Sequence, residues 1–211
     1  ASQNWKERKA AYEQVQTLFQ QAQSDDSDDF CDYAPFLKGM VQDSNASCLD
    51  VALDVLLAFA DGYANASELS PELAPAVVAK GLSGRPGTIT RAEAALLKLM
   101  EVDNPDVVAA TLLEGLSDKK PKVPPACVGI LIKAMELFGA RAMPLKDLKA
   151  ALPGICYDLG NVVAVRQQGL ALAAEIISWC GEPMLTSVVS ELRAGQKTDL
   201  DGLVKEKATG S

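Results

Sequence analysis

Pairs of helical segments, each pair divided by a short polar break, constrain the fold of this 211-residue chain more than any other feature. The clearest break is the stretch 118–123, where three lysines accompany a proline that prevents continuous helix. Apolar residues recur at helical spacing on both sides of it; in the segment that follows they are Cys127, Ile130, Leu131, Ala134, Met135 and Phe138. A short basic turn therefore divides two helices that each bury one face.

This arrangement recurs along the chain. A glycine followed by an apolar residue ends the first helix of four successive units, with spacings of 42, 34 and 39 residues, at Gly39, Gly81, Gly115 and Gly154. Such spacings are typical of two-helix HEAT-type repeats, and strand patterns are nearly absent. The sequence therefore predicts an all-α fold, an α-solenoid of about six helical pairs with the first incomplete. The predicted pairs are 4–24, 29–62, 70–103, 104–139, 144–181 and 182–207, in a single domain 1–208 followed by a tail or linker at 209–211.

The first helix has a recognisable start. Asn4 is predicted to cap it and Glu7 to complete a capping box. Its buried face is expected to contain Ala11, Val15, Leu18, Phe19 and Ala22. The acidic stretch 24–29 is interpreted as a linker, with a solvated helix start as the alternative.

Composition excludes several classes of function. The chain has no histidine, so it lacks the commonest general base and metal ligand, and an enzyme, a metal site or a cofactor is not expected. A net charge of −8 disfavours nucleic acid as a partner. No apolar run approaches the ~18 residues of a membrane span, and no signal peptide is recognised. The glycines at 81–87 lack the Gly-Lys-Ser/Thr of a phosphate loop. Five scattered cysteines are interpreted as buried thiols of a reducing compartment rather than disulfides.

The breaks carry the candidate contact residues. Within-pair turns of a helical stack emerge along one edge, where basic and hydrogen-bonding groups would suit an acidic protein surface. For any single residue the simpler alternative stands: a solvated lysine, a tryptophan that packs, or an arginine (Arg166, after Val165) that only starts a helix. The predicted contact residues are Trp5, Lys6, Arg8, Ser44, Asn45, Arg85, Thr88, Lys119, Lys120, Lys122 and Arg166.

These turns resemble those of a known family. The segments 5–8, 43–45, 118–123 and 164–166 are similar, in order and spacing, to successive turns of TOG domains, the HEAT-repeat arrays of microtubule polymerases, and most similar to the first TOG domain. The resemblance implies binding of the curved αβ-tubulin heterodimer by one module of a longer multi-TOG protein. It places Trp5, Lys6, Arg8, Ser44 and Asn45 against β-tubulin, and Lys119, Lys122 and Arg166 toward α-tubulin. It further implies a cytoplasmic protein of the cytoskeleton, at microtubule plus ends, spindle and centrosome.

Two alternatives remain open at this stage. One is a general HEAT-repeat scaffold that binds another protein through its concave face. The other is a rescue-type TOG module that stabilises microtubules instead of speeding their growth. The number of TOG modules in the full protein is left open.

Overall fold

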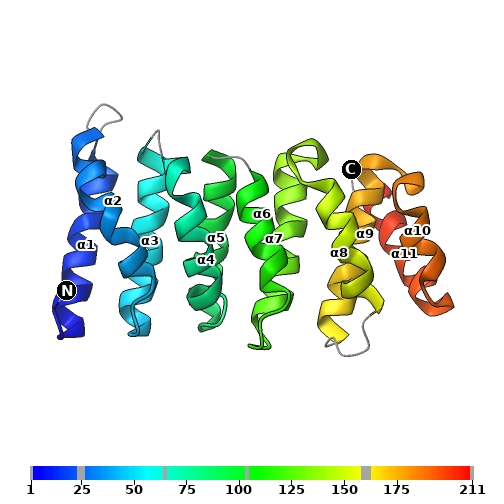
Figure 1. The fold of residues 1–211 in the computed structure, drawn as a ribbon, viewed down its shortest axis with the longest axis horizontal. Helices are drawn as coiled ribbons and strands as arrows, with labels where there is room; N and C mark the ends of the chain where they lie inside the picture. Colours follow the sequence, from blue (N-terminus) through cyan, green and yellow to red (C-terminus); the bar gives the residue numbers. More distant parts are fainter. Residues whose placement is uncertain (1, 23–26, 64–65, 103–104, 158–162, 210–211) are drawn as a thin grey trace. The chain divides into compact units, whose positions relative to one another are not determined.

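The computed structural model describes residues 2–22, 27–63, 66–102, 105–157 and 163–209, and Figure 1 shows its ribbon. The described residues form α-helices joined by turns and short 3₁₀ segments, with no strand among them. The predicted all-α solenoid class is therefore confirmed. The chain divides into two compact units, 1–111 and 112–211, and the division falls within α6 (Pro105–Gly115).

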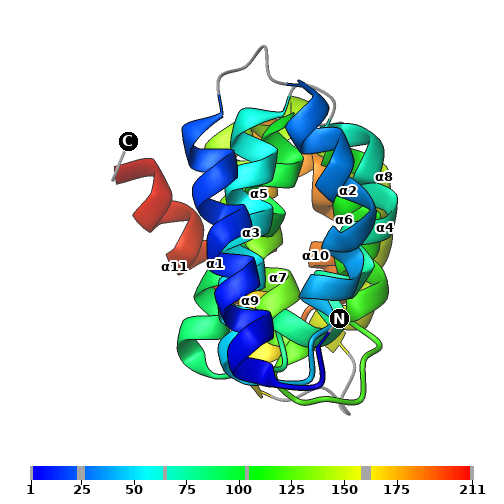
Figure 2. The ribbon, with the colours of Figure 1, turned by 90° about the vertical axis from the view of Figure 1, so that its left-hand side faces the viewer.

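The first unit has two layers of helices. In one layer α3 packs between α1 and α5, and in the other α2 packs against α4. The helices α1, α3 and α5 all begin at the same edge of this unit, the lower edge in Figure 1. Figure 2 shows the two layers side by side, with α1, α3 and α5 in one and α2 and α4 in the other. The bounds are α1 Trp5–Gln21, α2 Ser27–Val41, α3 Ala46–Gly62, α4 Ser70–Gly81 and α5 Pro86–Val102, with a 3₁₀ segment at Ala66–Leu69.

An aromatic cluster fills one end of this unit. Phe19 of α1 stacks on Phe30 of α2, with ring centroids 4.9 Å apart, and both rings contact Phe59 of α3. Gly62 allows the close approach, since a Cβ there would lie 2.7 Å from the Phe30 ring. Gly62 is the last residue of α3, and the capping residue is Tyr63.

Two expectations for this unit need correction. On α1, the residue that faces the core of the unit is Tyr12 and not Ala11, which is exposed. The Tyr12 ring packs inward, while its hydroxyl donates a hydrogen bond to Asp43. The acidic stretch is not wholly a linker, because α2 begins at Ser27; residues 23–26 lie outside the described part of the chain.

The second unit repeats the pairing. α9 packs between α7 and α11, and α8 packs against α9. Gly139, with φ +80°, ends α7 in a backbone conformation that favours glycine. Prolines 124 and 125 occupy the first turn of α7, a position that tolerates proline. The bounds are α7 Val123–Phe138, α8 Leu145–Tyr157, α9 Val163–Cys180, α10 Thr186–Glu191 and α11 Ala194–Thr209, with 3₁₀ segments at Ala140–Ala142 and Glu182–Leu185.

The cysteines are free thiols in two classes. Cys48, Cys127 and Cys156 are buried, whereas Cys31 and Cys180 are exposed, so the expectation of uniformly buried thiols was wrong for two of them. Burial raises the pKa of Cys127 to about 12 and that of Cys156 to about 11.

Candidate protein-binding surface

The first turn of α1 presents an exposed tryptophan. The Asn4 side chain caps the helix by accepting a hydrogen bond from the Lys6 backbone N–H at 3.0 Å. Glu7 completes this cap differently from a capping box: its carboxylate accepts from the side chains of Asn4 and Ser2. Trp5 is 41% exposed, and the Lys6 ammonium lies 5.9 Å from the centre of its ring. An indole of this exposure is available to a partner and is not a core residue.

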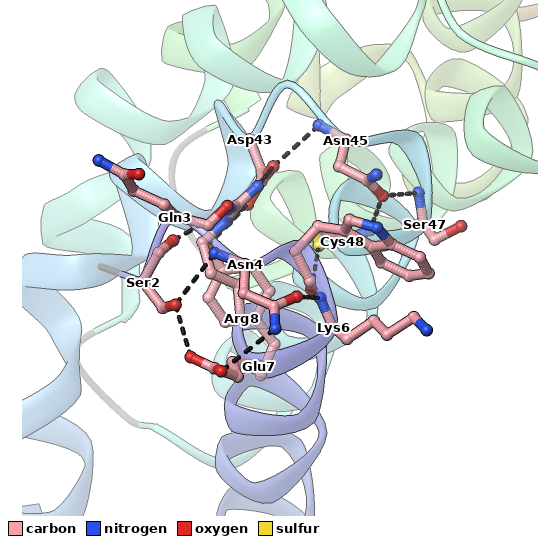
Figure 3. A network of polar contacts seen from close by, with 12 residues as sticks. Ser2, Gln3, Asn4, Lys6, Glu7, Arg8, Asp43, Asn45, Ser47 and Cys48 are labelled. Carbon is pink, nitrogen blue, oxygen red and sulfur yellow. Dashed lines mark hydrogen bonds and ion pairs between the residues drawn. The ribbon is translucent and has the colours of Figure 1, made fainter.

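A buried carboxylate fixes the start of α1 to the turn before α3. Arg8 donates through Nε and Nη2 to the two oxygens of Asp43, at 2.7 and 2.9 Å, and Figure 3 shows this pair at the centre of a polar network. Tyr12 and the Asn45 backbone N–H also donate to Asp43, whose side chain is only 3% exposed. The hydrogen bonds from Arg8 lower the pKa of Asp43 and hold it ionised.

Arg8 was predicted to contact a partner, but its side chain pairs with Asp43 within the chain. Its remaining Nη1 donates to the backbone oxygens of Ser2 and Gln3 at 2.9 and 3.1 Å, and its side chain is 15% exposed. The guanidinium is committed to partners within the chain, so its geometry is that of a residue that positions its neighbours.

The turn between α2 and α3 completes this surface. Asn45 caps α3 by accepting from the backbone N–H groups of Ser47 and Cys48, and Ser44 beside it is exposed. The Cys48 thiol donates to the backbone oxygen of Trp5 at 3.2 Å, which ties the tryptophan to α3. Hereafter the Trp5 surface means Trp5, Lys6, Ser44 and Asn45.

The turn between α4 and α5 contradicts one predicted contact. Thr88 is 1% exposed and donates to Asp50 of α3, so it holds α5 against α3 and is not available to a partner. Arg85 is exposed but forms an ion pair with the same Asp50. The helices are joined further along by the pairs Arg91–Asp54 and Lys98–Asp61. Arg85 was predicted to face a partner, and the structure uses it at least in part between its own helices.

The second unit carries the predicted lysines on its first turn. Lys119, Lys120 and Lys122 are all exposed in the segment between α6 and α7, where Asp118 accepts from the Lys120 backbone N–H. Arg166 is half-buried and lies within the first turn of α9, not in the turn before it. The helices α7 and α9 are neighbours and begin at the same edge of this unit (Figure 1). Residues 158–162, between α8 and α9, lie outside the described part of the chain.

Other kinds of site find no support in the part of the chain that the structure describes. No group of three or more carboxylate or thiol side chains is placed to hold a metal ion there. None of the helices described is both long enough and apolar enough to cross a membrane.

Sequence reasoning missed the structural roles of Asp43 and Asp50. Asp43 organises the Trp5 surface by accepting from Arg8 and from the Asn45 backbone N–H, whereas Asp50 of α3 accepts from Arg85 and Thr88 and so joins α3 to the start of α5. The segment 43–45 was recognised as a turn, but neither acid was named as a contact residue. An aspartate two residues before a capping asparagine was the available signal for Asp43. Nothing local identified its partner, which lies 35 residues away.

Comparison with known proteins gives one consistent result. The family described as XMAP215/Dis1/CLASP, TOG domain, matches residues 1–203. Protein MOR1 of Oryza sativa subsp. japonica is 31% identical over 94% of this chain, and Drosophila melanogaster mini spindles is 28% identical over 87%. The chain spans about a tenth of the length of these relatives, 10% and 9%.

Solved structures agree in fold. Drosophila melanogaster Mini spindles TOG3 superposes with a TM-score of 0.83 at 16% identity, over 98% of this chain and 90% of that one. A TOG array studied for tubulin recruitment and assembly by microtubule polymerases superposes with a TM-score of 0.84 at 21% identity, over 98% of this chain and 44% of that one. The matched span, the relatives and the helical architecture together show that the chain belongs to the XMAP215/Dis1/CLASP TOG domain family.

Proposed function

We propose that this chain is a tubulin-binding module that captures the curved, unpolymerised αβ-tubulin heterodimer through its within-pair turns. The observation that carries the proposal is the Trp5 surface: an exposed indole whose backbone is tied to α3 and whose helix start is fixed by the Arg8–Asp43 pair. A rigid, exposed tryptophan bordered by polar groups is a typical anchor of a protein interface. Similarity to TOG domains across nearly the whole chain supports tubulin as the partner.

The two units contribute different chemistry to this proposal. The Trp5 surface offers an aromatic ring, one ammonium and capped turns, which suits a contact based on packing and hydrogen bonds with β-tubulin. Lys119, Lys120 and Lys122 offer three exposed charges, with Arg166 on the neighbouring helix, which suits an acidic surface of α-tubulin. Arg8 and Arg85 are paired with Asp43 and Asp50, so their charges are already used in part within the first unit.

The central test is Trp5→Ala with Phe36→Ala as its matched control. Both remove an exposed aromatic side chain of the first unit, 41% and 61% exposed respectively. We expect Trp5→Ala to lose about 2 kcal/mol or more of binding, roughly 30-fold, in co-elution with purified tubulin on a sizing column. Its unfolding free energy should fall by much less than the 3–5 kcal/mol that a buried aromatic costs. Phe36→Ala should co-elute like the parent. A folded Trp5→Ala that still co-elutes would refute the assignment.

The proposed setting is that of a polymerase module. We place the chain within a longer multi-TOG protein that promotes growth at plus ends, in the cytoplasm, at spindle and centrosome. The names of two further relatives, a spindle pole body component of Schizosaccharomyces pombe and a centrosomal protein of Dictyostelium discoideum, support this placement. Preference for free dimers over pelleted, stabilised microtubules would support capture of curved tubulin; the reverse preference would favour the rescue-type alternative.

A further inference from the structure

A groove in the second unit has no part in the proposed tubulin contact. It has a volume of about 750 Å³ and is bordered by α7, α9 and α11. Ile132, Ala171 and Leu203 supply its apolar lining, and the Trp179 ring forms one wall. Trp179 is 53% exposed, more than Trp5, in a chain that has only two tryptophans.

A network of charges holds this exposed ring in place. The Trp179 Nε1–H donates to Glu175 at 2.8 Å, and Glu175 is 4% exposed. Glu175 is ion-paired with Lys207 of α11, whose ammonium also donates to Glu136 of α7 at 3.1 Å. One edge of the ring packs against Gly139 at the end of α7. The orientation of Trp179 is therefore fixed by its hydrogen bond to Glu175 and by its contact with Gly139, while a large part of its surface stays open.

The groove carries an excess of negative charge. Its lining contains the carboxylates of Glu136, Glu175 and Glu206 but a single ammonium, that of Lys207, which two of these carboxylates already share. Glu206 is exposed on α11 beside the open part of the groove. A phosphate or a nucleic acid would be repelled here, and an uncharged apolar segment would desolvate carboxylates without pairing them.

We propose that this groove binds an arginine side chain of an extended basic peptide segment. A guanidinium is planar and weakly hydrated, so it can stack on the exposed Trp179 face while its fork pairs with Glu206. The aliphatic part of the same side chain would lie on Ile132, Ala171 and Leu203. The packing of α11 against α7 and α9 accounts for the ion pairs of Lys207 with Glu136 and Glu175. It does not account for the exposed face of Trp179 or for the exposed carboxylate of Glu206 in the same groove.

The test follows the indole N–H signals of the two tryptophans by NMR, assigned with a Trp5→Phe variant. The probe is a capped peptide with three arginines in a glycine–serine background, and its control is the same peptide with citrulline, which keeps the shape and removes the charge. We expect a saturable shift of the Trp179 signal with the arginine peptide only. Trp179→Ala should weaken peptide binding at least about five-fold, the size of a partly desolvated cation–π contact.

Two variants of α11 separate the groove from general charge effects. Glu206→Gln removes one charge inside the groove, and Asp199→Asn removes one from an exposed position on the same helix that does not line it. The first should weaken binding about two- to five-fold and the second should leave it unchanged. The proposal is wrong if the Trp179 signal does not move at millimolar peptide, if citrulline moves it equally, or if both variants behave alike. Trp179→Ala should still co-elute with tubulin, so this result does not depend on the proposed function.

Discussion

Replacing Asp43 with asparagine tests whether a buried charge organises the Trp5 surface. The substitution keeps the shape of the side chain but removes the charge, and its amide turns donors toward the donors of Arg8. Asp43 accepts four hydrogen bonds from three residues, at 2.7, 2.9, 3.1 and 2.8 Å, and its side chain is 3% exposed. The loss of unfolding free energy should therefore be larger than the loss caused by breaking a typical surface ion pair.

The magnitude follows from this burial. Removing one partner of a fully buried pair costs 3–5 kcal/mol, and since this pair lies near the surface we expect about 2 kcal/mol, or a melting temperature about 4–8 °C lower. Asp54→Asn is the matched control, because it breaks the Arg91–Asp54 pair between α5 and α3, whose side chains are 42% and 33% exposed. That variant should lose less than about 1 kcal/mol. Urea unfolding at neutral pH measures both values.

The pH dependence of the unfolding free energy tests whether the charge of Asp43 causes the loss of stability. The pKa of Asp43 is lowered in the folded protein, mainly by hydrogen bonds from Arg8, so its contribution is present above the unfolded pKa of about 4 and is lost as pH falls through the folded value. Asparagine does not titrate. The gap in unfolding free energy between the parent and Asp43→Asn should thus be constant from pH 8 to 5 and narrow progressively as pH falls below about 4. A gap that does not narrow below pH 4, or equal losses in Asp43→Asn and Asp54→Asn, would refute the reasoning.

Three further predictions concern binding and thiol chemistry. Tubulin affinity should fall as ionic strength rises, and joint replacement of Lys119, Lys120 and Lys122 by alanine should flatten that dependence, whereas salt-independent binding would favour an apolar concave site. Arg166→Ala should weaken binding by about 2 kcal/mol with the helical circular dichroism unchanged; unaltered affinity would mean that Arg166 only begins α9. In a thiol-labelling assay at pH 8, two cysteines should react quickly in the native protein and all five after denaturation, because three are buried; five fast thiols would contradict the fold.

The helical pairs could be predicted because their signals are local. Asn4 and Asn45 were readable as caps or breaks, and the apolar spacing after Lys122 placed α7 correctly. The failures lay where a tertiary contact overrode the pattern. Thr88 was read as a turn residue, yet it is buried because it donates to an aspartate on another helix, 38 positions earlier in the sequence. Periodicity can show which face of a helix is buried but not which polar group crosses to a neighbour.

The candidate surface shows the same limit. Trp5 was correctly expected to be exposed, because it lies in the first helical turn, outside the apolar series. Arg8, three residues later, carries the same turn motif but faces Asp43 across the helix pair. A single sequence cannot separate a cation that meets a partner from one that holds the turn, since both are charged residues in a polar break. The turn before α3 distinguishes the two cases, because it contains Asp43, the partner of Arg8.

Fixing the tryptophan within the free module has a thermodynamic consequence for recognition. An exposed aromatic on a frayed helix end would lose backbone and side-chain freedom on binding, which weakens the complex. Here the cap by Asn4, the pair with Asp43 and the thiol contact from Cys48 restrict that freedom before any partner arrives. The charges used for this are shielded from solvent and salt, while the lysines of the second unit remain exposed. Under the proposed tubulin contact, the first unit supplies orientation and the second supplies electrostatic attraction, so mutations should alter the two contributions separately.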